Sequence, residues 1–287
     1  MEPIISIITT THNIIEKGQA DDFALQCKLL KMQSYKNIEH IVIDNASTDG
    51  TIDLLNDYKS RGHLTFYSEK DSNKFDGYNK GITKSKGQYL TFISCDDFFH
   101  DITALSDLVT VMEMNNADFA FSPSYCRHPK DIVFLYMPSM YNVFQVMPCP
   151  RQCMFYKKSA LAFEKGFDTK FKYMADFDLI IRMVMKKHKG VFFERNYTTY
   201  KLGENLYQHA EWGDEEAKQI FIKNYKDMTK LSDELLEDMV KRSAFPQDLL
   251  DKLVTKFPES DRILFYDRCE QMRGMRTEAS KHINGGQ

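Results

Sequence analysis

The chain has 287 residues, of which 43% are hydrophobic and 13% aromatic, so it can bury a full core and form one large domain with an appendage. Its 38 basic and 41 acidic residues leave a net charge of −3, which excludes a global field that would attract nucleic acid. The apolar N-terminal run turns polar at Thr9, too early for a signal peptide or a membrane span, so we expect a cytoplasmic protein.

The cysteines give no sign of a metal site or of a disulfide framework. No Cys-x-x-Cys pair occurs among the six, and the nearest two, Cys149 and Cys153, have no second pair to complete a zinc site. We therefore expect reduced thiols, most of which fill the core.

Strands and helices alternate in the first part of the chain. Apolar runs predict buried strands over residues 4–8, 39–43 and 64–68, and apolar residues at helical spacing predict helices over 22–32, 52–58 and 78–85. Asp21 or Asp22 is expected to cap the first helix, and Gly87 is expected to end the third as a C-cap glycine. The alternation predicts an α/β fold with a mainly parallel sheet flanked by helices, whose ligands collect at the carboxyl ends of the strands.

Two adjacent carboxylates follow the apolar run 89–93. Asp96 and Asp97 repel each other unless a cation lies beside them, and a hard divalent cation bound to phosphate oxygens is the usual neutraliser. The alternative is that Asp97 caps a helix beginning near Phe98 while Asp96 is solvated. Asp44 also follows a predicted strand, so these carboxylates share one rim if their strands are neighbours in the sheet.

The remainder of the chain predicts further strands and then helices. Strands are predicted over residues 118–122, 191–195 and 197–200, helices over 102–114 and 177–185, and irregular strands and loops over 123–148. Helices with an apolar stripe are predicted over 215–228, 232–241, 247–257 and 260–273. Such stripes pack on the same chain, form a homodimer or contact a membrane surface, and the basic C-terminal end leaves the membrane option open.

Four segments of the sequence carry a family resemblance. They are Ser6–Asn13, Ile43–Thr51, Phe75–Ile82 and Tyr89–Asp97. Their order and spacing resemble the family 2 glycosyltransferases of the GT-A (Rossmann-like) fold, especially the branch found in bacterial surface-polysaccharide pathways. The resemblance covers roughly residues 3–205. It implies a nucleotide-sugar-binding catalytic domain over 1–205 and a C-terminal helical extension over 206–287.

The resemblance implies a nucleotide site at the strand ends. The matching residues are Thr9, Thr11, Asn13, Asp44, Asp76, Asn79, Ser94, Cys95 and Asp96. Asp44 matches the acid that accepts a hydrogen bond from a pyrimidine base, although an Asp in this position can also simply form a turn. Thr9 and Thr11 match the loop that packs around the base and the ribose.

The resemblance also implies Mn²⁺ or Mg²⁺ held by Asp96 and Asp97. Asp96 matches the last acid of the Asp-x-Asp metal motif, and Asp97 matches the acid that follows it. Ser94 stands where the motif has its first acid, which leaves fewer anionic ligands for the metal. His209 and Trp212 lie where related enzymes sometimes bring a His to the metal, but we expect His209 to be a surface residue.

Asp176 matches the catalytic base of the family. It would take the proton from an acceptor hydroxyl, while the alternative is that it only caps the helix over 177–185. Asp178 would point to another side of that helix and is expected to be structural. Arg151 and Gln152 match a segment that lines the acceptor side.

These residues together imply a metal-dependent, inverting hexosyl- or N-acetylhexosaminyltransferase. It would move a sugar from a UDP-linked donor to a hydroxyl of a glycan or lipid-linked acceptor, in the cytoplasm or at the inner face of the membrane. A nucleotidyltransferase is the alternative enzyme, but it needs a Gly-rich basic loop, and residues 9–13 contain no Gly, Arg or Lys. A non-catalytic scaffold has only Ser94 in its support.

Overall fold

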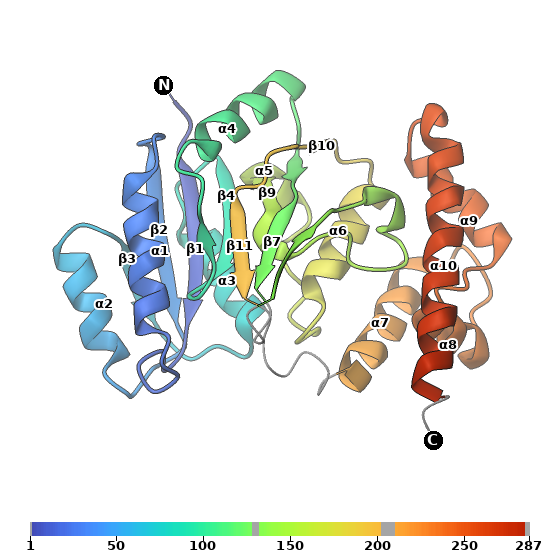
Figure 1. The fold of residues 1–287 in the computed structure, drawn as a ribbon, viewed down its shortest axis with the longest axis horizontal. Coiled ribbons are helices and arrows are strands. Elements are labelled where there is room, and N and C mark those ends of the chain that lie inside the picture. Colours follow the sequence, from blue (N-terminus) through green and yellow to red (C-terminus); the bar gives the residue numbers. More distant parts are fainter. Residues whose placement is uncertain (1, 128–131, 202–209, 285–287) are drawn as a thin grey trace. The chain divides into compact units, whose positions relative to one another are not determined.

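The computed structural model describes residues 2–127, 132–201 and 210–284 (Figure 1). The chain divides into two compact units. The first comprises Met1–Pro138, Cys149–Lys172 and His188–Glu204, and the second comprises Ser139–Pro148, Tyr173–Lys187 and Asn205–Gln287. The boundary expected between residues 205 and 206 lies outside the described residues. Two segments from the range 1–205 group with the C-terminal helices.

A seven-stranded sheet forms the centre of the first unit (Figure 1). Its strands are, in spatial order, β10 (Gly190–Phe192), β6 (Phe119–Phe121), β9 (Met154–Lys157), β4 (Tyr89–Ser94), β1 (Ile5–Thr11), β2 (Ile38–Asp44) and β3 (Thr65–Ser68). Only β9 is antiparallel to its neighbours, so the predicted mainly parallel sheet is confirmed. The sequence did not predict β9, because a run of four residues has too little periodicity.

Helices cover both faces of this sheet. On one face lie α1 (Ala20–Met32), α2 (Thr51–Ser60) and α4 (Ala104–Asn115). Their buried side chains join two apolar clusters with Ile7 of β1 and Val42 of β2. On the other face lies α3 (Lys74–Lys84), where the ring of Tyr78 packs edge-on against Phe92 of β4 at 5.2 Å. The central strands β1 and β4 are therefore buried on both sides, which explains why they read as continuous apolar runs.

A smaller sheet stands beside the large one in the first unit. Its strands are, in spatial order, β5 (Phe98–Phe99), β11 (Thr198–Lys201), β7 (Ser124–Arg127) and β8 (Val133–Tyr136). The irregular strands predicted over residues 123–148 are thus confirmed as the antiparallel pair β7 and β8. A short helix, α5 (Lys158–Phe163), follows β9 and was not predicted.

Gly87 does not end α3, so the predicted C-cap is wrong. The C-cap is Ser85, whose φ of −69° needs no glycine. Gly87 instead lies against β1, where an added Cβ would be 2.2 Å from Ser6 Oγ and 2.8 Å from Ser6 N. The glycine is needed because two backbone segments approach closely, not because a helix ends there.

The starts of two helices also differ from the prediction. Helix α3 begins at Lys74, earlier than expected, because the Asn73 side chain accepts hydrogen bonds from the N–H groups at the start of the helix. Helix α1 has Gln19 as its N-cap residue, without a side-chain hydrogen bond, and Asp21 and Asp22 lie in its first turn. The two acids therefore favour the helix through its dipole and not as caps.

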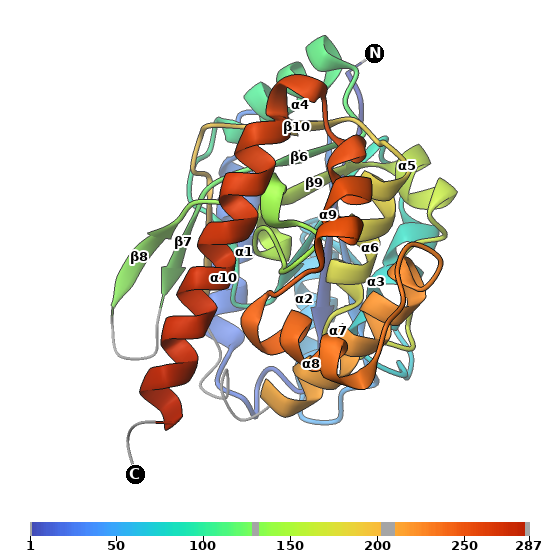
Figure 2. The same cartoon turned by 90° about the vertical axis from the view of Figure 1, so that its right-hand side faces the viewer.

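The second unit is helical. It contains α6 (Ala175–Met185), α7 (Ala210–Tyr225), α8 (Asp233–Arg242), α9 (Gln247–Leu253) and α10 (Arg262–Asn284), and Figure 2 shows the last four. The rings of Phe221 and Tyr225 on α7 pack against Phe245, and the Tyr225 hydroxyl donates to the Phe144 carbonyl at 2.9 Å. The four predicted terminal helices are confirmed, and the last is longer than expected. Their apolar stripes contribute buried residues to this unit, including Leu236 and Phe265.

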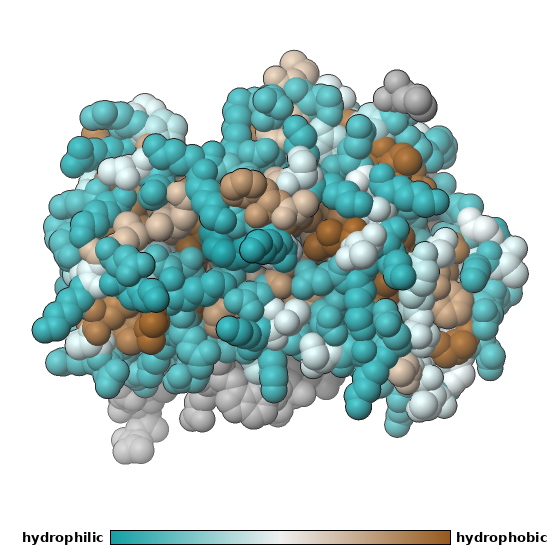
Figure 3. All heavy atoms as spheres, turned by 180° about the vertical axis from the view of Figure 1, so that it is seen from behind, coloured by the Kyte–Doolittle hydropathy of each residue, from teal (hydrophilic) through white to brown (hydrophobic). Residues whose placement is uncertain are grey.

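On the face drawn in Figure 3, polar side chains predominate and hydrophobic side chains gather in separate patches. Among the described helices, none combines the length and the apolar character that crossing a membrane requires.

All six cysteines are unpaired and buried, which confirms the expectation of thiols in the core. Burial raises the pKa of the Cys27 and Cys153 thiols to about 12. These thiols stay protonated at neutral pH and are therefore poor nucleophiles and poor metal ligands.

Candidate functional site

The carboxyl ends of β1, β2 and β4 form one rim of the large sheet. Thr11 of β1 lies beside Asp44 of β2, and β4 pairs with the other edge of β1 up to Ser94. Asp96 and Asp97 follow Ser94 directly. Because β1 separates β2 from β4, the three carboxylates lie along a single rim, with the end of β1 between them.

Asp44 is fully buried and accepts four hydrogen bonds. The donors are the Thr11 hydroxyl at 3.0 Å, the Ser47 N–H at 2.9 Å, the Ser47 hydroxyl at 2.5 Å and the Ser68 hydroxyl at 2.7 Å. The carboxylate therefore organises the loop after β2, which is the turn-forming role expected as the alternative.

Asn13 joins the loops after β1 and β2. Its φ of 49° lies in the left-handed region, which Asn tolerates better than most residues. Its N–H donates to the Ser47 hydroxyl at 2.8 Å, and its side-chain carbonyl accepts from the Thr48 N–H at 3.0 Å. Asn13 thus fixes the shape of the rim beside Asp44.

A buried chain of hydrogen bonds supports the rim from below. Gln26 on α1 donates to the carbonyl oxygens of Ser94 and Asp97, each at 2.6 Å. Its own carbonyl accepts from the Thr9 hydroxyl at 3.1 Å, which in turn lies 3.0 Å from Nε2 of His40. Thr9 is fully buried within β1, so its hydroxyl holds the turn after β4 and is not exposed on the rim.

Asp96 and Asp97 have different environments. Asp97 is 1% exposed, and its carboxylate accepts from the Ser94 N–H at 2.7 Å and from the Gln152 amide at 2.8 Å. Burial, together with the neighbouring Asp96, raises the pKa of Asp97 to about 6. Asp96 is only partly buried, and Gln19 donates to it at 3.3 Å. Of the two carboxylates, Asp96 is therefore the one that can reach a ligand.

The donor set on the rim suits a metal that shares its ligands with a substrate. Within the described residues, no group of three or more His, Cys, Asp or Glu side chains is placed to hold a metal ion by itself. Mg²⁺ is commonly bound through one or two carboxylates plus substrate phosphates and water, and Asp96 can supply one carboxylate. His209 and the side chain of Trp212 lie outside the described residues. The alternative in which Asp97 caps a helix is wrong, because β5 begins at Phe98.

Arg151 and Gln152 form part of a short 3₁₀ turn before β9, and both are buried. The Arg151 guanidinium lies 4.9 Å from the centre of the Tyr78 ring, which is a cation–π contact. Gln152 reaches Asp97, as described above. Arg151 and Gln152 therefore support the rim from the β9 side. Cys95 is buried in the apolar cluster that includes Phe23 and Cys27 of α1, and burial raises the pKa of its thiol.

Asp76 and Asn79 on α3 bond within the first unit. Asp76 accepts from the Ser72 N–H at 2.9 Å and lies 3.7 Å from the Lys80 ammonium. The Asn79 amide donates to the Phe167 carbonyl at 2.8 Å and accepts from the Phe167 N–H at 2.9 Å. Asn79 therefore fastens α3 to the segment after α5.

Several residues that build the rim were not predicted from the sequence. Gln26 lies in a segment predicted as a helix with an apolar face, and His40 lies in a predicted buried strand. A polar residue among apolar neighbours was the sign in the sequence that could have identified both. Asp71 is also buried, where it pairs with the Lys80 ammonium at 2.7 Å and fixes the loop before α3.

Asp176 lies in the second unit, at the second position of α6. The N-cap residue is Met174, so the alternative in which Asp176 only caps the helix is wrong. Its carboxylate is 3.0 Å from the Phe177 N–H, and the side chain is partly exposed. The flanking Met174 and Phe177 line a cavity of about 360 Å³ in this unit, together with Asp214 and Arg276.

Asp178 has the structural role expected for it. It is fully buried and receives the Arg182 guanidinium at 2.8 Å and the Lys223 ammonium at 2.8 Å. Asn224 also donates to it at 3.3 Å. Asp178 thus joins α6 to α7.

Comparisons with known proteins agree with this architecture. Two solved structures share the fold: Staphylococcus aureus TarS 1-349 in complex with UDP-GlcNAc, and the mannosyltransferase PcManGT from Pyrobaculum calidifontis in complex with GDP-Man and Mn²⁺. For TarS the TM-score is 0.63 and the identity 14%, over 98% of this chain and 92% of that one. For PcManGT they are 0.61 and 17%, over 100% and 89%. The chain therefore has the GT-A fold.

Sequence relatives carry the assignment further. The Escherichia coli UDP-Glc:alpha-D-GlcNAc-diphosphoundecaprenol beta-1,3-glucosyltransferase WfaP is 28% identical over 130 residues. That match takes in 45% of this chain and 49% of WfaP, so the chain spans about half the length of this relative. The family model named Glycosyl transferase family 2 matches residues 6–167, more than half of the chain. This protein therefore belongs to glycosyl transferase family 2.

Proposed function

We propose that the protein is a metal-dependent, inverting glycosyltransferase that uses a UDP-sugar. The sugar would be a hexose or an N-acetylhexosamine, and the acceptor a hydroxyl of a glycan or lipid-linked saccharide. The observation that carries the proposal is the single rim on which β1, β2 and β4 bring Asn13, Asp44 and Asp96 together. WfaP, by its name, uses UDP-Glc and a diphosphoundecaprenol-linked acceptor, and TarS was solved with UDP-GlcNAc.

The base of the nucleotide would meet Asp44. A carboxylate accepts from N3–H of uracil, and at Asp44 a rotating hydroxyl would give up its place to that donor. Thr11 and Asn13 would line the base and ribose side of the rim. Five residues below or beside the rim would hold its loops in place, namely Thr9, Ser94, Cys95, Asp76 and Asn79.

The diphosphate would lie toward Asp96. Asp96 would hold Mn²⁺ or Mg²⁺ together with phosphate oxygens, and the ion would neutralise charge on the leaving diphosphate. The Ser94 N–H and the Gln152 amide both donate to one oxygen of the Asp97 carboxylate, Oδ2. That oxygen would keep the turn after β4 in shape and would not bind the ion. PcManGT, a relative by fold, was solved with Mn²⁺.

The acceptor hydroxyl would be deprotonated by Asp176 as its oxygen attacks the anomeric carbon. The cavity that Met174 and Phe177 line, on either side of Asp176 in the sequence, has further apolar walls from Met147 and Phe221, and it would receive part of the acceptor. We place this work in the cytoplasm, at the inner face of the membrane if the acceptor is lipid-linked.

A panel of nucleotide sugars tests the proposal by thermal shift, with Mn²⁺ and with EDTA. UDP-sugars should raise the melting temperature with Mn²⁺, and EDTA or Asp96→Ala should abolish the shift. Asp53→Ala, which removes an exposed acid on α2, is the matched control and should behave as wild type. If no UDP-sugar binds, the donor assignment is wrong. If binding survives both EDTA and Asp96→Ala, the metal assignment is wrong.

A further inference from the structure

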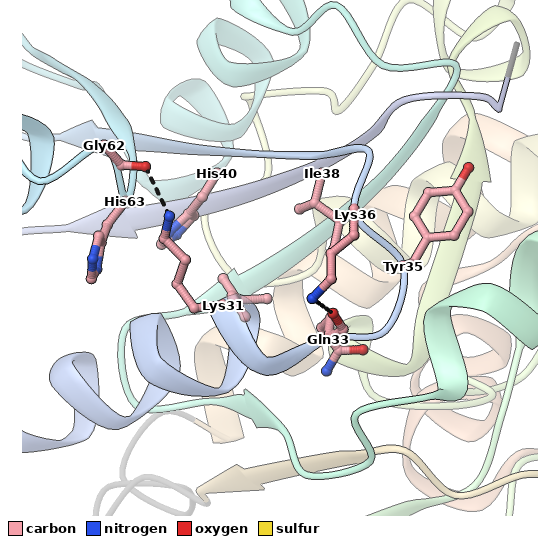
Figure 4. Close-up of a pocket in the computed structure, with 9 residues that line it drawn as sticks. Lys31, Gln33, Tyr35, Lys36, Ile38, His40, Gly62 and His63 are labelled. Carbon is pink, nitrogen blue, oxygen red and sulfur yellow. Dashed lines mark hydrogen bonds between the residues drawn. The ribbon is translucent and has the colours of Figure 1, made fainter.

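A second polar cavity lies in the first unit, apart from the rim. Its volume is about 200 Å³, and it lies between the end of α1, the start of β2 and residues 62–63 (Figure 4). Its lining includes two lysines, two histidines and a glutamine, namely Lys31, Lys36, His40, His63 and Gln33, and is completed by Leu30, Tyr35, Ile38 and Gly62. At about 30 Å³ per water molecule, this volume can hold a small ligand.

His40 presents a bare nitrogen that no group in the described chain satisfies. Because the Gln26 amide donates to two carbonyls, its oxygen must be the partner of Thr9, so the Thr9 hydroxyl donates to Gln26. That hydroxyl can then only accept from Nε2–H of His40. The proton of the neutral ring is thereby placed on Nε2, and Nδ1 is an acceptor. His40 is 6% exposed, and its Nδ1 has no hydrogen-bond partner in the described residues.

Gln33, which also lines the cavity, has a second buried acceptor. Its amide nitrogen donates to the Asp101 carbonyl at 3.1 Å, which leaves the amide oxygen as the group without a partner in the described chain. A buried acceptor that stays unsatisfied carries a free-energy cost. A ligand with hydroxyl hydrogens would remove that cost for both His40 and Gln33.

The lysines give the cavity its charge. Lys31 donates to the Gly62 carbonyl at 3.2 Å and Lys36 to the Gln33 carbonyl at 2.7 Å, and each ammonium has further N–H groups to offer (Figure 4). None of the lining residues, all in the described part of the chain, is acidic. The C-terminal end of the α1 helix dipole contributes roughly half a negative charge. The two positive charges of Lys31 and Lys36 are larger than this. The cavity therefore favours an anion.

We propose that this cavity binds a phosphate group, either as inorganic phosphate or as the monoester of a small molecule. Hydrogen phosphate, or the singly charged form of a monoester, combines the two chemistries that the lining requires, because each keeps one P–OH group. That group donates to Nδ1 of His40, and the charged oxygens accept from Lys31 and Lys36. The lining includes neither Asp44 nor Asp96, so this site does not depend on the proposed donor site.

Calorimetry with inorganic phosphate, a hexose phosphate and sulfate tests the proposal. Sulfate matches phosphate in shape and charge but has no proton at neutral pH, so it cannot donate to His40. We expect phosphate to bind at least tenfold more tightly than sulfate. The double variant Lys31→Gln, Lys36→Gln should lose phosphate binding by at least tenfold, while Lys28→Gln, on an exposed position of α1, should keep it. Whether inorganic phosphate or the hexose phosphate binds more tightly identifies the source of the group.

A nuclear magnetic resonance titration locates the contact. The ¹⁵N signal of His40 Nδ1 should shift when phosphate is added to the wild-type protein and should not shift in the double variant. An unchanged far-UV circular dichroism spectrum and a cooperative thermal unfolding transition of the double variant serve as the check that it has folded. Equal affinity for phosphate and sulfate, undiminished phosphate binding in the folded double variant, or an unmoved His40 signal at saturation would each overturn the proposal.

Discussion

Replacing Asp44 by Asn separates the two roles of this carboxylate. It keeps the size of the side chain but removes its charge and turns one acceptor into a donor. The backbone N–H of Ser47 cannot rotate, so the amide oxygen must face it, together with the Ser68 hydroxyl. The new NH₂ group then faces the hydroxyls of Thr11 and Ser47, which must turn to accept. Exchanging charge-assisted for neutral hydrogen bonds should lower the free energy of unfolding by about 1–3 kcal/mol.

The same change should alter the choice of nucleotide. Uracil presents N3–H, which a carboxylate accepts, whereas cytosine presents a lone pair at N3, which the amide introduced by the substitution can satisfy by donating. UDP should bind the Asp44→Asn variant about 5- to 150-fold more weakly, which corresponds to about 1–3 kcal/mol. CDP should lose less or gain. Inorganic pyrophosphate lacks a base and should bind both proteins equally.

Calorimetry with these ligands, in the presence of Mn²⁺, checks the prediction. Urea unfolding of the same samples measures the stability change separately, so a binding loss is not confused with unfolding. Asp53→Asn on α2 is the matched control. If UDP binds wild type and the Asp44→Asn variant equally, or if pyrophosphate weakens as much as UDP, Asp44 forms the turn and does not contact the base.

Further predictions concern the support of the two units. Gly87→Ala should destabilise the fold by about 1–3 kcal/mol, since its Cβ would be 2.8 Å from the Ser6 backbone, whereas Gly274→Ala on α10 meets nothing within 4 Å and should be neutral or stabilising in the same urea titration. Burial lowers the pKa of His40 to about 3 from an unfolded value of 6.5, so the unfolded state takes up a proton that the folded state does not, and stability falls with pH below 6.5. Between pH 6.5 and 5, in buffers without phosphate, the free energy of unfolding should fall by about 2 kcal/mol in wild type, and this fall should be absent from His40→Gln. Equal slopes of the free energy of unfolding against pH in the two proteins would contradict the prediction. Asp178→Asn should lower the free energy of unfolding by about 3 kcal/mol, because it leaves two cations beside a neutral buried group, and an unchanged unfolding midpoint would refute this.

The sequence predicted the strands that build the rim because each is a local apolar run that ends in polar residues. It also predicted that Asp178 is structural, because side chains two positions apart on a helix, such as those of Asp176 and Asp178, point to different sides of it. The chain from His40 through Thr9 to Gln26 could not be predicted in this way. Those three residues lie on two strands and a helix, and only the paired register of β1 and β2 brings them together.

Gly87 shows how a contact distant in sequence can decide the role of a residue. It follows a helix, which suggested a cap, but its real constraint is the nearby backbone of β1. The environments of the adjacent acids were not predictable from local pattern either, because Gln152 donates to the buried Asp97 carboxylate, whereas Asp96 is only partly buried. That the two acids bind one cation stays a prediction.

We proposed that Asp176 deprotonates the acceptor hydroxyl in a single displacement that inverts the configuration at the anomeric carbon. The rate of transfer from the UDP-sugar identified by the panel should be measured as release of UDP, and the anomeric configuration of the product should be determined by nuclear magnetic resonance. Both measurements are made on wild type, on Asp176→Asn and on the control Asp233→Asn, which changes an exposed acid in the first turn of α8. Asp176→Asn should keep UDP affinity and lose about 10²- to 10⁴-fold in rate, while the control matches wild type and the product has the anomeric configuration opposite to that of the donor. Wild-type turnover by Asp176→Asn, or a product that keeps the donor's configuration, would contradict the account.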